Sequence, residues 1–300
     1  MMQIARRNLL LGGMAVLALP PTLARAEAKR RIVTIGGAMT EIVFALGHGD
    51  EVVAVDTTSL YPFERTDRLP KVGYLRALAT EGILSMQPDL ILADRDAGPP
   101  NVVNQLKGMG VDFEQFPDKP GAETVAAKTA FVGRAVGAVE RAGEIATAYV
   151  DDLKALRGTV EKLSDRPSVL FLLNAGTNGL RGAGVGTGAD DMIRLAGGIN
   201  AFGAASGYQT VSPESAMTAN PDFILMMQQS VDELGGMAEV GALPALASLD
   251  ATAKGRIVGM NGDYLLGFGP RTAHAGRDLA AALHPQALIP SLPARPWVGT

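Results

Sequence analysis

The chain has 300 residues, of which 47% are hydrophobic and 19% are charged, and its formal net charge is −4. This composition is typical of a globular protein long enough for two domains, and it excludes an intrinsically disordered chain. After residue 26 the chain carries 24 basic and 31 acidic side chains, a net −7, so a nucleic-acid partner is not expected. There is no cysteine, which excludes disulfides, thiolate metal sites and a cysteine nucleophile.

Residues 1–26 have the parts of a secretory signal peptide. Paired arginines, Arg6-Arg7, precede an apolar run from Leu9 to Leu19, and Ala24-Arg25-Ala26 forms a small-x-small cleavage site. The run is far shorter than the roughly 20 residues that span a bilayer. The paired arginines suggest export by the twin-arginine route. Because no cysteine is present to carry a lipid, we expect a freely diffusing, non-lipidated protein of the periplasm.

Residues 31–121 alternate between strand and helix patterns. Short β-branched or apolar runs at 31–35, 52–55, 89–93 and 111–116 predict four strands, and the last three are separated by helical patterns at 76–86 and 101–109. A further helical pattern at 39–47 separates the first two strands. Strands that alternate with helices form parallel sheets. The sequence therefore predicts an N-terminal α/β lobe over 31–121.

Residues 122–164 form the predicted connector. Apolar or small residues recur there at the three-and-four spacing of one helix face, beginning with Val125, Val132, Val136 and Val139. A single helix of this length would extend about 60 Å, longer than either lobe, and we expect it to join the lobes rigidly. The alternative is a pair of helices broken near Gly133 or Gly137.

A C-terminal α/β lobe is predicted over 167–285. Its strands are expected at 168–173, 222–227 and 256–260, and its helices at 189–195, 212–220 and in a segment that ends near 283. The glycine-rich stretch 174–188 lacks both the Gly-Lys-Ser/Thr ending and the Gly-x-Gly-x-x-Gly opening of nucleotide loops. The tail 286–300 contains three prolines and is expected to be irregular.

An internal repeat relates the two lobes. Glu81 is followed by Pro88-Asp89-Leu90, and Glu214 is followed at the same offset by Pro221-Asp222-Phe223. A repeat of this kind predicts two lobes with one plan. If a pseudo-two-fold axis relates the lobes, both glutamates begin equivalent helices on one face. The purely structural explanation is that the helix dipole favours an acid in the first turn.

Residues suited to catalysis are few. The chain has three histidines, His48, His274 and His284, and none lies at metal-ligand spacing from another. We expect His48 and His284 to be solvated surface residues. There is no Gly-x-Ser-x-Gly motif, so an enzyme is not expected.

Two α/β lobes joined by one long helix resemble the helical-backbone class (class III) of periplasmic substrate-binding proteins of ABC transporters, which serve haem, cobalamin and ferric siderophores. Four segments are similar to the haem-binding (hemin) branch of that class: TTSLYP at 57–62, GYLRALATEGILSMQPDLIL at 73–92, AGPP at 97–100 and GFGPRT at 267–272. The resemblance covers essentially the whole mature chain. It implies a monomer that carries ferric haem b as a transported ligand to an ABC permease, with an outer-membrane haem receptor system upstream.

The resemblance gives Tyr61 the role of axial ligand to the haem iron. Ferric iron favours an anionic oxygen and can displace the proton of a phenol, whose ordinary pKa is about 10. A nearby cation stabilises the phenolate. Relatives often place a basic residue two positions after the ligand, where this chain has Phe63, so Arg65 or Arg95 is expected to supply the charge. The alternative is that Tyr61 stacks on the ligand without a bond to the metal.

The resemblance also implies the rest of the pocket and a docking surface. Tyr74, Tyr264, Leu266 and Phe268 are expected as its walls, and Arg76, Arg181 and Arg271 as partners of the propionates. In some relatives a histidine of the second lobe holds a second haem. Stretch 174–188 contains no histidine, so we expect one haem rather than two. Glu81 and Glu214 are expected to dock onto arginines of the permease, with Glu41 as a weaker alternative.

Three other functions stay open at this point. The first is the same transport role with a corrinoid or a ferric siderophore as cargo. The second is an enzyme, a tetrapyrrole metal chelatase built on a related two-lobed plan. The third is a structural protein of the cell envelope that binds no ligand.

Overall fold

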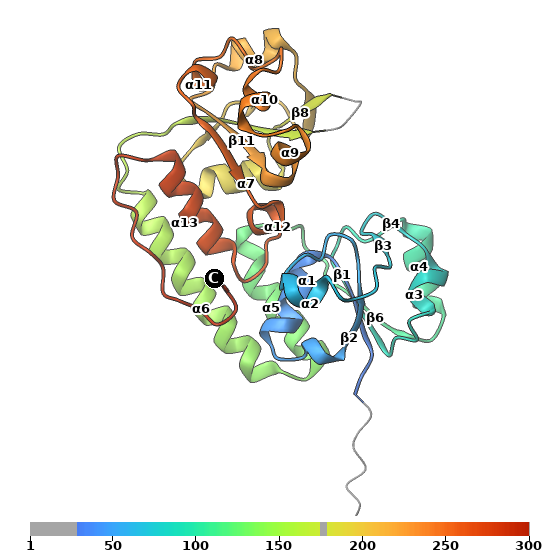
Figure 1. The fold of residues 1–300 in the computed structure, drawn as a ribbon. Coiled ribbons are helices and arrows are strands. Elements are labelled where there is room, and N and C mark those ends of the chain that lie inside the picture. Colours follow the sequence, from blue (N-terminus) through green and yellow to red (C-terminus); the bar gives the residue numbers. More distant parts are fainter. Residues whose placement is uncertain (1–28, 175–178, 300) are drawn as a thin grey trace, which may run out of the picture.

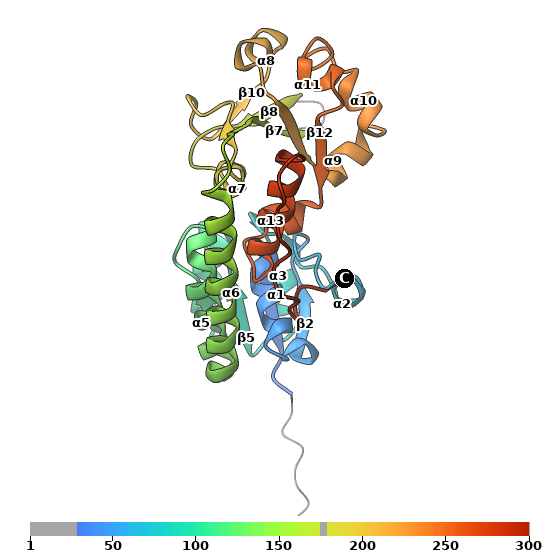
Figure 2. The ribbon, with the colours of Figure 1, turned by 90° about the vertical axis from the view of Figure 1, so that its left-hand side faces the viewer.

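The computed structural model describes residues 29–174 and 179–299. Two α/β lobes lie at the two ends of a long helix (Figures 1 and 2). The predicted signal peptide lies outside the described residues. Within the described ranges, no helix is long and apolar enough to cross a membrane.

The first lobe is a four-stranded parallel sheet in the order β2-β1-β5-β6. Every residue of β1 and β5 is buried, as expected for continuous apolar strands covered on both faces. Helices α1, α5 and α6 pack on one face of the sheet, and α3 and α4 pack on the other. The strands are β1 (Ile32–Ile35), β2 (Val52–Val55), β5 (Leu90–Ala93) and β6 (Asp112–Gln115), and the helices are α1 (Gly37–Ala45), α3 (Thr80–Leu84) and α4 (Pro100–Gly108).

One predicted element of this lobe is shorter than expected. The helical pattern at 76–86 gives only α3, because its first residues pair as a small antiparallel hairpin, β3 (Gly73–Tyr74) with β4 (Ala77–Leu78). A short helix, α2 (Phe63–Thr66), follows the Tyr61-Pro62 dipeptide. Both additions lie in the stretch between β2 and β5.

The second lobe has a six-stranded mixed sheet. Its main path is β10-β8-β7-β11-β12, with β9 paired to β7. The pairs β7–β9, β7–β11 and β11–β12 are parallel, whereas β8 pairs antiparallel with both of its neighbours, β7 and β10. The strands are β7 (Ser168–Asn174), β8 (Leu180–Ala183), β9 (Ile199–Asn200), β10 (Tyr208–Thr210), β11 (Phe223–Met227) and β12 (Ile257–Met260). The helices are α7 (Gly188–Leu195), α8 (Pro213–Ala219), α9 (Gln228–Glu233), α10 (Met237–Gly241), α11 (Asp250–Ala253), α12 (Gly262–Leu266) and α13 (Thr272–Leu283).

The repeated Pro-Asp segment makes the same contact in both lobes. The Oδ2 atom of Asp89 accepts a hydrogen bond from the Arg31 N–H at 2.8 Å, and Oδ2 of Asp222 accepts one from the Ser168 N–H at 2.9 Å. Each bond ties the start of a central strand, β5 or β11, to the start of its parallel neighbour, β1 or β7. The recurrence of this residue in the sequence therefore reflects one structural task performed twice.

The connector differs from the expected single helix over 122–164. It consists of α5 (Val125–Val136) and α6 (Val139–Val160), which pack side by side (Figure 2). The chain reverses at Gly137, whose φ of 79° is the left-handed conformation that commonly ends a helix. The expectation of one continuous helix is therefore wrong, and the alternative of two helices holds. The sequence pattern did not separate them because both helices bury an apolar stripe, so the three-and-four spacing continues across the turn.

Helix α6 is the long backbone helix that joins the lobes. Ala142 and Ile145 in its first half belong to the core of the first lobe, whereas Leu153 and Leu156 in its second half belong to the core of the second. Its 22 residues correspond to a rise of about 33 Å. The single connecting helix therefore contributes side chains to both cores.

Residues 286–299 carry neither helix nor strand, but they follow a defined course. They leave α13 in the second lobe and return beside α6 to the first lobe (Figures 1 and 2). Arg295 binds both carboxylate oxygens of Asp152 on α6, at 2.9 and 2.7 Å, and Trp297 packs against the core of the first lobe. We refer to residues 286–299 as the C-terminal strap.

Candidate functional site: the cleft between the lobes

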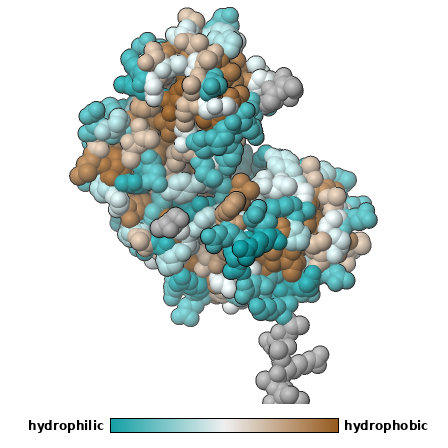
Figure 3. All heavy atoms as spheres, viewed as in Figure 1, coloured by the Kyte–Doolittle hydropathy of each residue, from teal (hydrophilic) through white to brown (hydrophobic). Residues whose placement is uncertain are grey.

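A cleft of about 760 Å³ lies between the two lobes. Figure 3 shows the corresponding notch in the surface of the molecule. Its volume is in the usual range for small-molecule sites, about 300–1,000 Å³. Residues from both lobes line it, among them Gly36, Thr58, Leu60, Tyr74, Arg76, Asp94 and Asp96 from the first lobe and Thr187, Tyr208, Met227, Asp263, Leu266 and Phe268 from the second.

The cleft combines apolar walls with cations at its sides. Leu266 and Phe268 line it from the second lobe and Tyr74 from the first. Arg76 and Lys119 also line the cleft, and the Arg76 guanidinium pairs with Asp96 at 2.5 Å. A ligand with a flat apolar body and anionic groups would find both kinds of partner here.

Tyr208 lies between two of the predicted arginines. Arg181 on β8 donates to the Tyr208 carbonyl at 2.5 Å. Burial raises the pKa of the Tyr208 phenol, and the positive charges of Arg76 and Arg181 oppose that rise. Arg76 of the first lobe and Tyr208 of the second both line the cleft, and Arg181 is bonded to Tyr208 although it is not itself among the lining residues.

Tyr61 lies next to the cleft but is not among the described residues that line it, whereas its neighbour Leu60 is. The Arg271 guanidinium carbon lies 3.5 Å from the centroid of the Tyr61 ring. The Tyr61 hydroxyl donates to the backbone carbonyl of Trp297 in the C-terminal strap at 3.4 Å. Burial raises the pKa of Tyr61, and the charge of Arg271 lowers it.

Arg271 sits in a buried cluster of charges that joins the lobes. Its Nη2 atom is 3.0 Å from Oε2 of Glu41 in the first lobe and 2.8 Å from Oδ2 of Asp263 in the second. Its backbone N–H donates to Oε1 of Glu41 at 3.0 Å. Burial, together with the charge of Glu41, raises the pKa of Asp263 to about 7. Arg271 is therefore paired with protein carboxylates rather than facing the cleft.

The alternative role for Glu41, docking onto a permease, is wrong. Its side chain is only 3% exposed, and its carboxylate is paired with Arg271. A residue buried between the two lobes has no surface to offer a partner.

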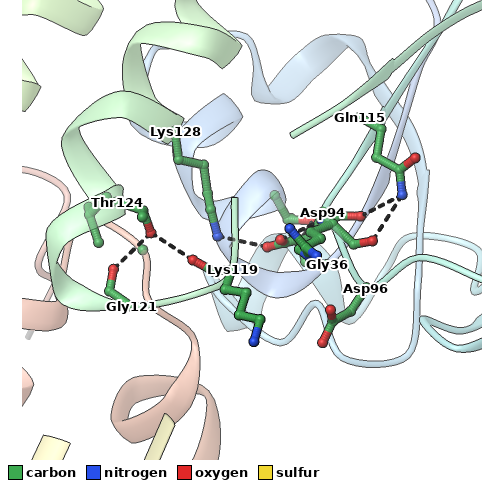
Figure 4. A network of polar contacts seen from close by, with 12 residues as sticks. Gly36, Asp94, Asp96, Gln115, Lys119, Gly121, Thr124 and Lys128 are labelled. Carbon is green, nitrogen blue, oxygen red and sulfur yellow. Dashed lines mark hydrogen bonds and ion pairs between the residues drawn. The ribbon is translucent and has the colours of Figure 1, made fainter. Parts of the chain in front are cut away.

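A second buried ion pair supports the floor of the cleft (Figure 4). Lys128 on α5 is completely buried, and its Nζ atom is 2.7 Å from Oδ2 of Asp94, which follows β5. Gly36 has a φ of 109°, and a Cβ there would lie 2.8 Å from the Cβ of Asp94, so only glycine fits beside the pair. Sequence reasoning missed this pair. The available signal was an acid at the carboxyl end of a buried parallel strand, where ligand sites of α/β sheets gather.

Three predicted site residues have their partners outside the cleft and are not among the described residues that line it. Arg65 pairs with Asp50 on the surface, Arg95 donates to the Pro117 carbonyl at 2.6 Å, and the Tyr264 hydroxyl donates to Asp278 at 2.8 Å. The expectation that Arg65 or Arg95 supplies a cation to Tyr61 is not met, because Arg271 occupies the face of that ring.

The histidines are less exposed than expected. His284 is 1% exposed, and its Nε2 atom lies 3.2 Å from the Ala196 carbonyl, so its assignment as a surface residue is wrong. His48 is half-buried beside Glu51, with its Nδ1 atom 2.8 Å from Oε1. No group of three His, Cys, Asp or Glu side chains in the described ranges is arranged to hold a metal ion.

Glu81 and Glu214 occupy equivalent positions in the two lobes. Each is exposed and is the second residue of its helix, α3 or α8. Each also has an exposed methionine nearby: Met109 lines a shallow groove together with Glu81, and Met217 lies one turn after Glu214. Met109 and Met217 are each 59% exposed.

Comparison with solved structures shows close likeness over nearly the whole described chain. The periplasmic heme-binding protein RhuT from Roseiflexus sp. RS-1, in apo form, is 38% identical with a TM-score of 0.83, and the match covers 86% of this chain and 99% of that one. The periplasmic heme-binding protein BhuT, in complex with two hemes, is also 38% identical with a TM-score of 0.78, covering 85% and 99%.

Curated relatives are more distant. The uncharacterized ABC transporter substrate-binding lipoprotein YvrC of Bacillus subtilis is 26% identical over 263 residues, covering 85% of this chain and 80% of YvrC. The vitamin B12-binding protein of Yersinia pestis is 27% identical over 268 residues, covering 88% and 90%. The family described as "Periplasmic binding protein" matches residues 32–264. The two-lobed fold with its helical backbone, the cleft and these matches agree: the chain belongs to the periplasmic binding protein family, the substrate-binding components of ABC transporters.

Proposed function

We propose that the protein binds ferric haem in the cleft between its lobes and delivers it to an ABC permease. The observation that carries the proposal is the make-up of the cleft, where Leu266 and Phe268 offer apolar surface and Arg76 offers a cation. A porphyrin has a flat apolar body and two carboxylates, so it needs both apolar surface and a cation. The identity of 38% to two heme-binding proteins supports the same cargo.

Tyr61 is the proposed axial ligand to the iron. Tyr61 is the residue after Leu60, which lines the cleft. The Arg271 guanidinium lies against the face of the Tyr61 ring. Iron ligation converts the phenol to a phenolate, and a cation against the ring stabilises that negative charge. The proposed stoichiometry is one haem per chain, although BhuT is described in complex with two hemes.

A corrinoid is the second candidate cargo, since the vitamin B12-binding protein of Yersinia pestis is 27% identical over 90% of its length. A corrinoid brings its own cobalt ligands and requires no protein phenolate. Dependence on the Tyr61 oxygen therefore separates the two cargoes.

The test is a titration of the protein lacking residues 1–26 with ferric haem, followed by absorbance, and a parallel titration with cobalamin. Wild type should saturate near one haem and show a phenolate-to-iron charge-transfer band. Tyr61→Phe should lose that band and bind at least tenfold more weakly, while the matched control Tyr74→Phe keeps the band. Cobalamin binding that Tyr61→Phe leaves intact, without saturable haem binding, would replace haem with a corrinoid.

Glu81 and Glu214 are the proposed contacts to the permease. One carboxylate projects from each lobe beside an exposed methionine, so each lobe offers an anionic group next to an apolar one. Two cationic loops on a two-fold symmetric permease would fit this pair of contacts. Delivery would then depend on both glutamates together.

The proposed location is the periplasm. The paired arginines of the leader support export by the twin-arginine route, and the absence of cysteine supports a protein without a lipid anchor, in contrast to the lipoprotein YvrC. In this scheme the protein acts as a monomer and receives haem from an outer-membrane receptor system upstream.

A further inference from the structure

We infer that the C-terminal strap is an autoinhibitory contact: its last described residues engage the Tyr61 hydroxyl and must release it before Tyr61 can bind the cargo. This inference rests on the proposed function in one respect, the role of Tyr61 as a ligand to iron. The contact itself is independent of that role.

The first argument is the chemistry at the phenol oxygen. The Tyr61 hydroxyl donates its one proton to the Trp297 carbonyl at 3.4 Å. Iron ligation removes that proton, and a phenolate oxygen has nothing to donate to a carbonyl. The Trp297 contact and the iron bond therefore exclude each other.

The second argument is the closeness of the strap to the ring. A Cβ atom added at Gly299 would lie 2.5 Å from the Tyr61 hydroxyl oxygen and 3.5 Å from Cζ. The strap therefore touches the atom that would bind iron, at the one strap position whose residue has no side chain. Tyr61 is correspondingly absent from the described residues that line the cleft, whereas Leu60 is present.

The third argument is the way the strap is anchored. Its upstream part stays on α13, where the Pro290 carbonyl accepts from Arg277 at 3.2 Å and the Pro293 carbonyl lies 3.0 Å from Nε2 of His274. Arg295 holds Asp152 on α6 through two hydrogen bonds. Among the described residues of the strap, Trp297 and Gly299 lie against Tyr61, and their contacts can break while the anchors on α13 and α6 stay in place.

The strength of the contact decides its effect. One hydrogen bond from the Tyr61 hydroxyl to the Trp297 carbonyl corresponds to a closed state favoured by up to about tenfold. A binding-competent state that is populated one time in ten weakens the apparent affinity tenfold. Loosening the strap should therefore tighten haem binding by about this factor.

Two strap variants and one matched control test the inference. Gly299→Ala pushes a methyl group against the Tyr61 oxygen without touching either core, and Trp297→Ala removes the anchor of the strap end. Leu288→Ala is the control, because Leu288 lies in the same strap and is 90% exposed. Stopped-flow haem binding should be about tenfold faster in both strap variants and unchanged in the control. Equal rates in all four proteins would overturn the inference.

A second readout needs no haem and separates this inference from the proposed function. In protein with ¹³C-labelled tyrosine rings, NMR at one fixed pH follows the ring signal of Tyr61, assigned by its loss in Tyr61→Phe. Trp297→Ala and Gly299→Ala disturb the strap contact at the Tyr61 hydroxyl, so this signal should shift in both variants and stay in place in Leu288→Ala. An unchanged Tyr61 signal in both strap variants would overturn the inference whether or not haem binds. Absence of haem binding together with a shifted Tyr61 signal would overturn only the proposed cargo.

Discussion

Arg271→Met is the substitution that tests the charge cluster between the lobes. Methionine keeps the length and apolar contacts of the side chain but removes its charge. Glu41 and Asp263, with side chains 3% and 6% exposed, then lose their cation. Removing one partner of a buried ion pair typically costs about 3–5 kcal/mol. Since the pKa of Asp263 is already raised to about 7, Asp263 can take up a proton, and only the charge of Glu41 stays uncompensated. We therefore expect a loss of about 3–5 kcal/mol rather than twice that amount.

The assay is urea unfolding at pH 7, followed by circular dichroism and by the fluorescence of Trp297, the single tryptophan of the chain. The triple variant that adds Glu41→Gln and Asp263→Asn removes the buried charges and should recover most of the loss. Arg65→Met is the matched control, because Arg65 pairs with Asp50 on the surface and should cost less than about 1 kcal/mol. A loss below 1 kcal/mol for Arg271→Met would refute the view that this arginine neutralises a buried carboxylate.

Two further predictions concern pH and docking. The pKa of Asp263 is raised from 3.8 to about 7, so the folded protein holds a proton that the unfolded chain has lost. Stability should therefore fall as pH rises from 5 to 8, by about 3 kcal/mol from this group, and Asp263→Asn should flatten that fall in urea unfolding. An equal slope in both proteins would contradict the assignment. Replacing Glu81 and Glu214 together by lysine should leave haem binding and the unfolding midpoint unchanged but abolish uptake through the reconstituted permease. Lysines at Glu140 and Glu161, two other exposed glutamates, should leave uptake unchanged. Weaker haem binding in the first pair would mean that these glutamates serve the fold.

The positions of the main strands along the chain and their parallel arrangement were largely predictable from the sequence, whereas their order within each sheet was not. β5 and β11 are continuous apolar runs that follow Pro-Asp, and such runs are typical of strands covered on both faces. β8, β9 and β10 were missed because they are short and lie in or after a glycine-rich stretch with no two-residue alternation. The break at Gly137 was the alternative and not the preferred prediction, because helical periodicity reports which face is buried and not whether the chain reverses.

The site was predictable only in part. Tyr74, Arg76, Leu266 and Phe268 line the cleft, and all four lie in or directly before segments that resemble haem-binding proteins. The pairing of Arg271 with Glu41 joins residues that are 230 positions apart, and no local pattern announces such a pair. The contact between Tyr61 and Trp297 spans 236 positions and was hidden for the same reason, since a proline-rich tail gives no indication of where it will lie.

The division of α6 between two cores has a consequence for how this protein can be taken apart. A fragment that ends at the turn near Gly137 would lack Ala142 and Ile145 and leave the first lobe with an open apolar face. A fragment that begins after α6 would deprive the second lobe of Leu153 and Leu156. Neither half is a complete folding unit, although each looks like a domain in outline. The two lobes are separate in shape but share α6 as part of both cores, and exchange of lobes between relatives would have to carry α6 intact.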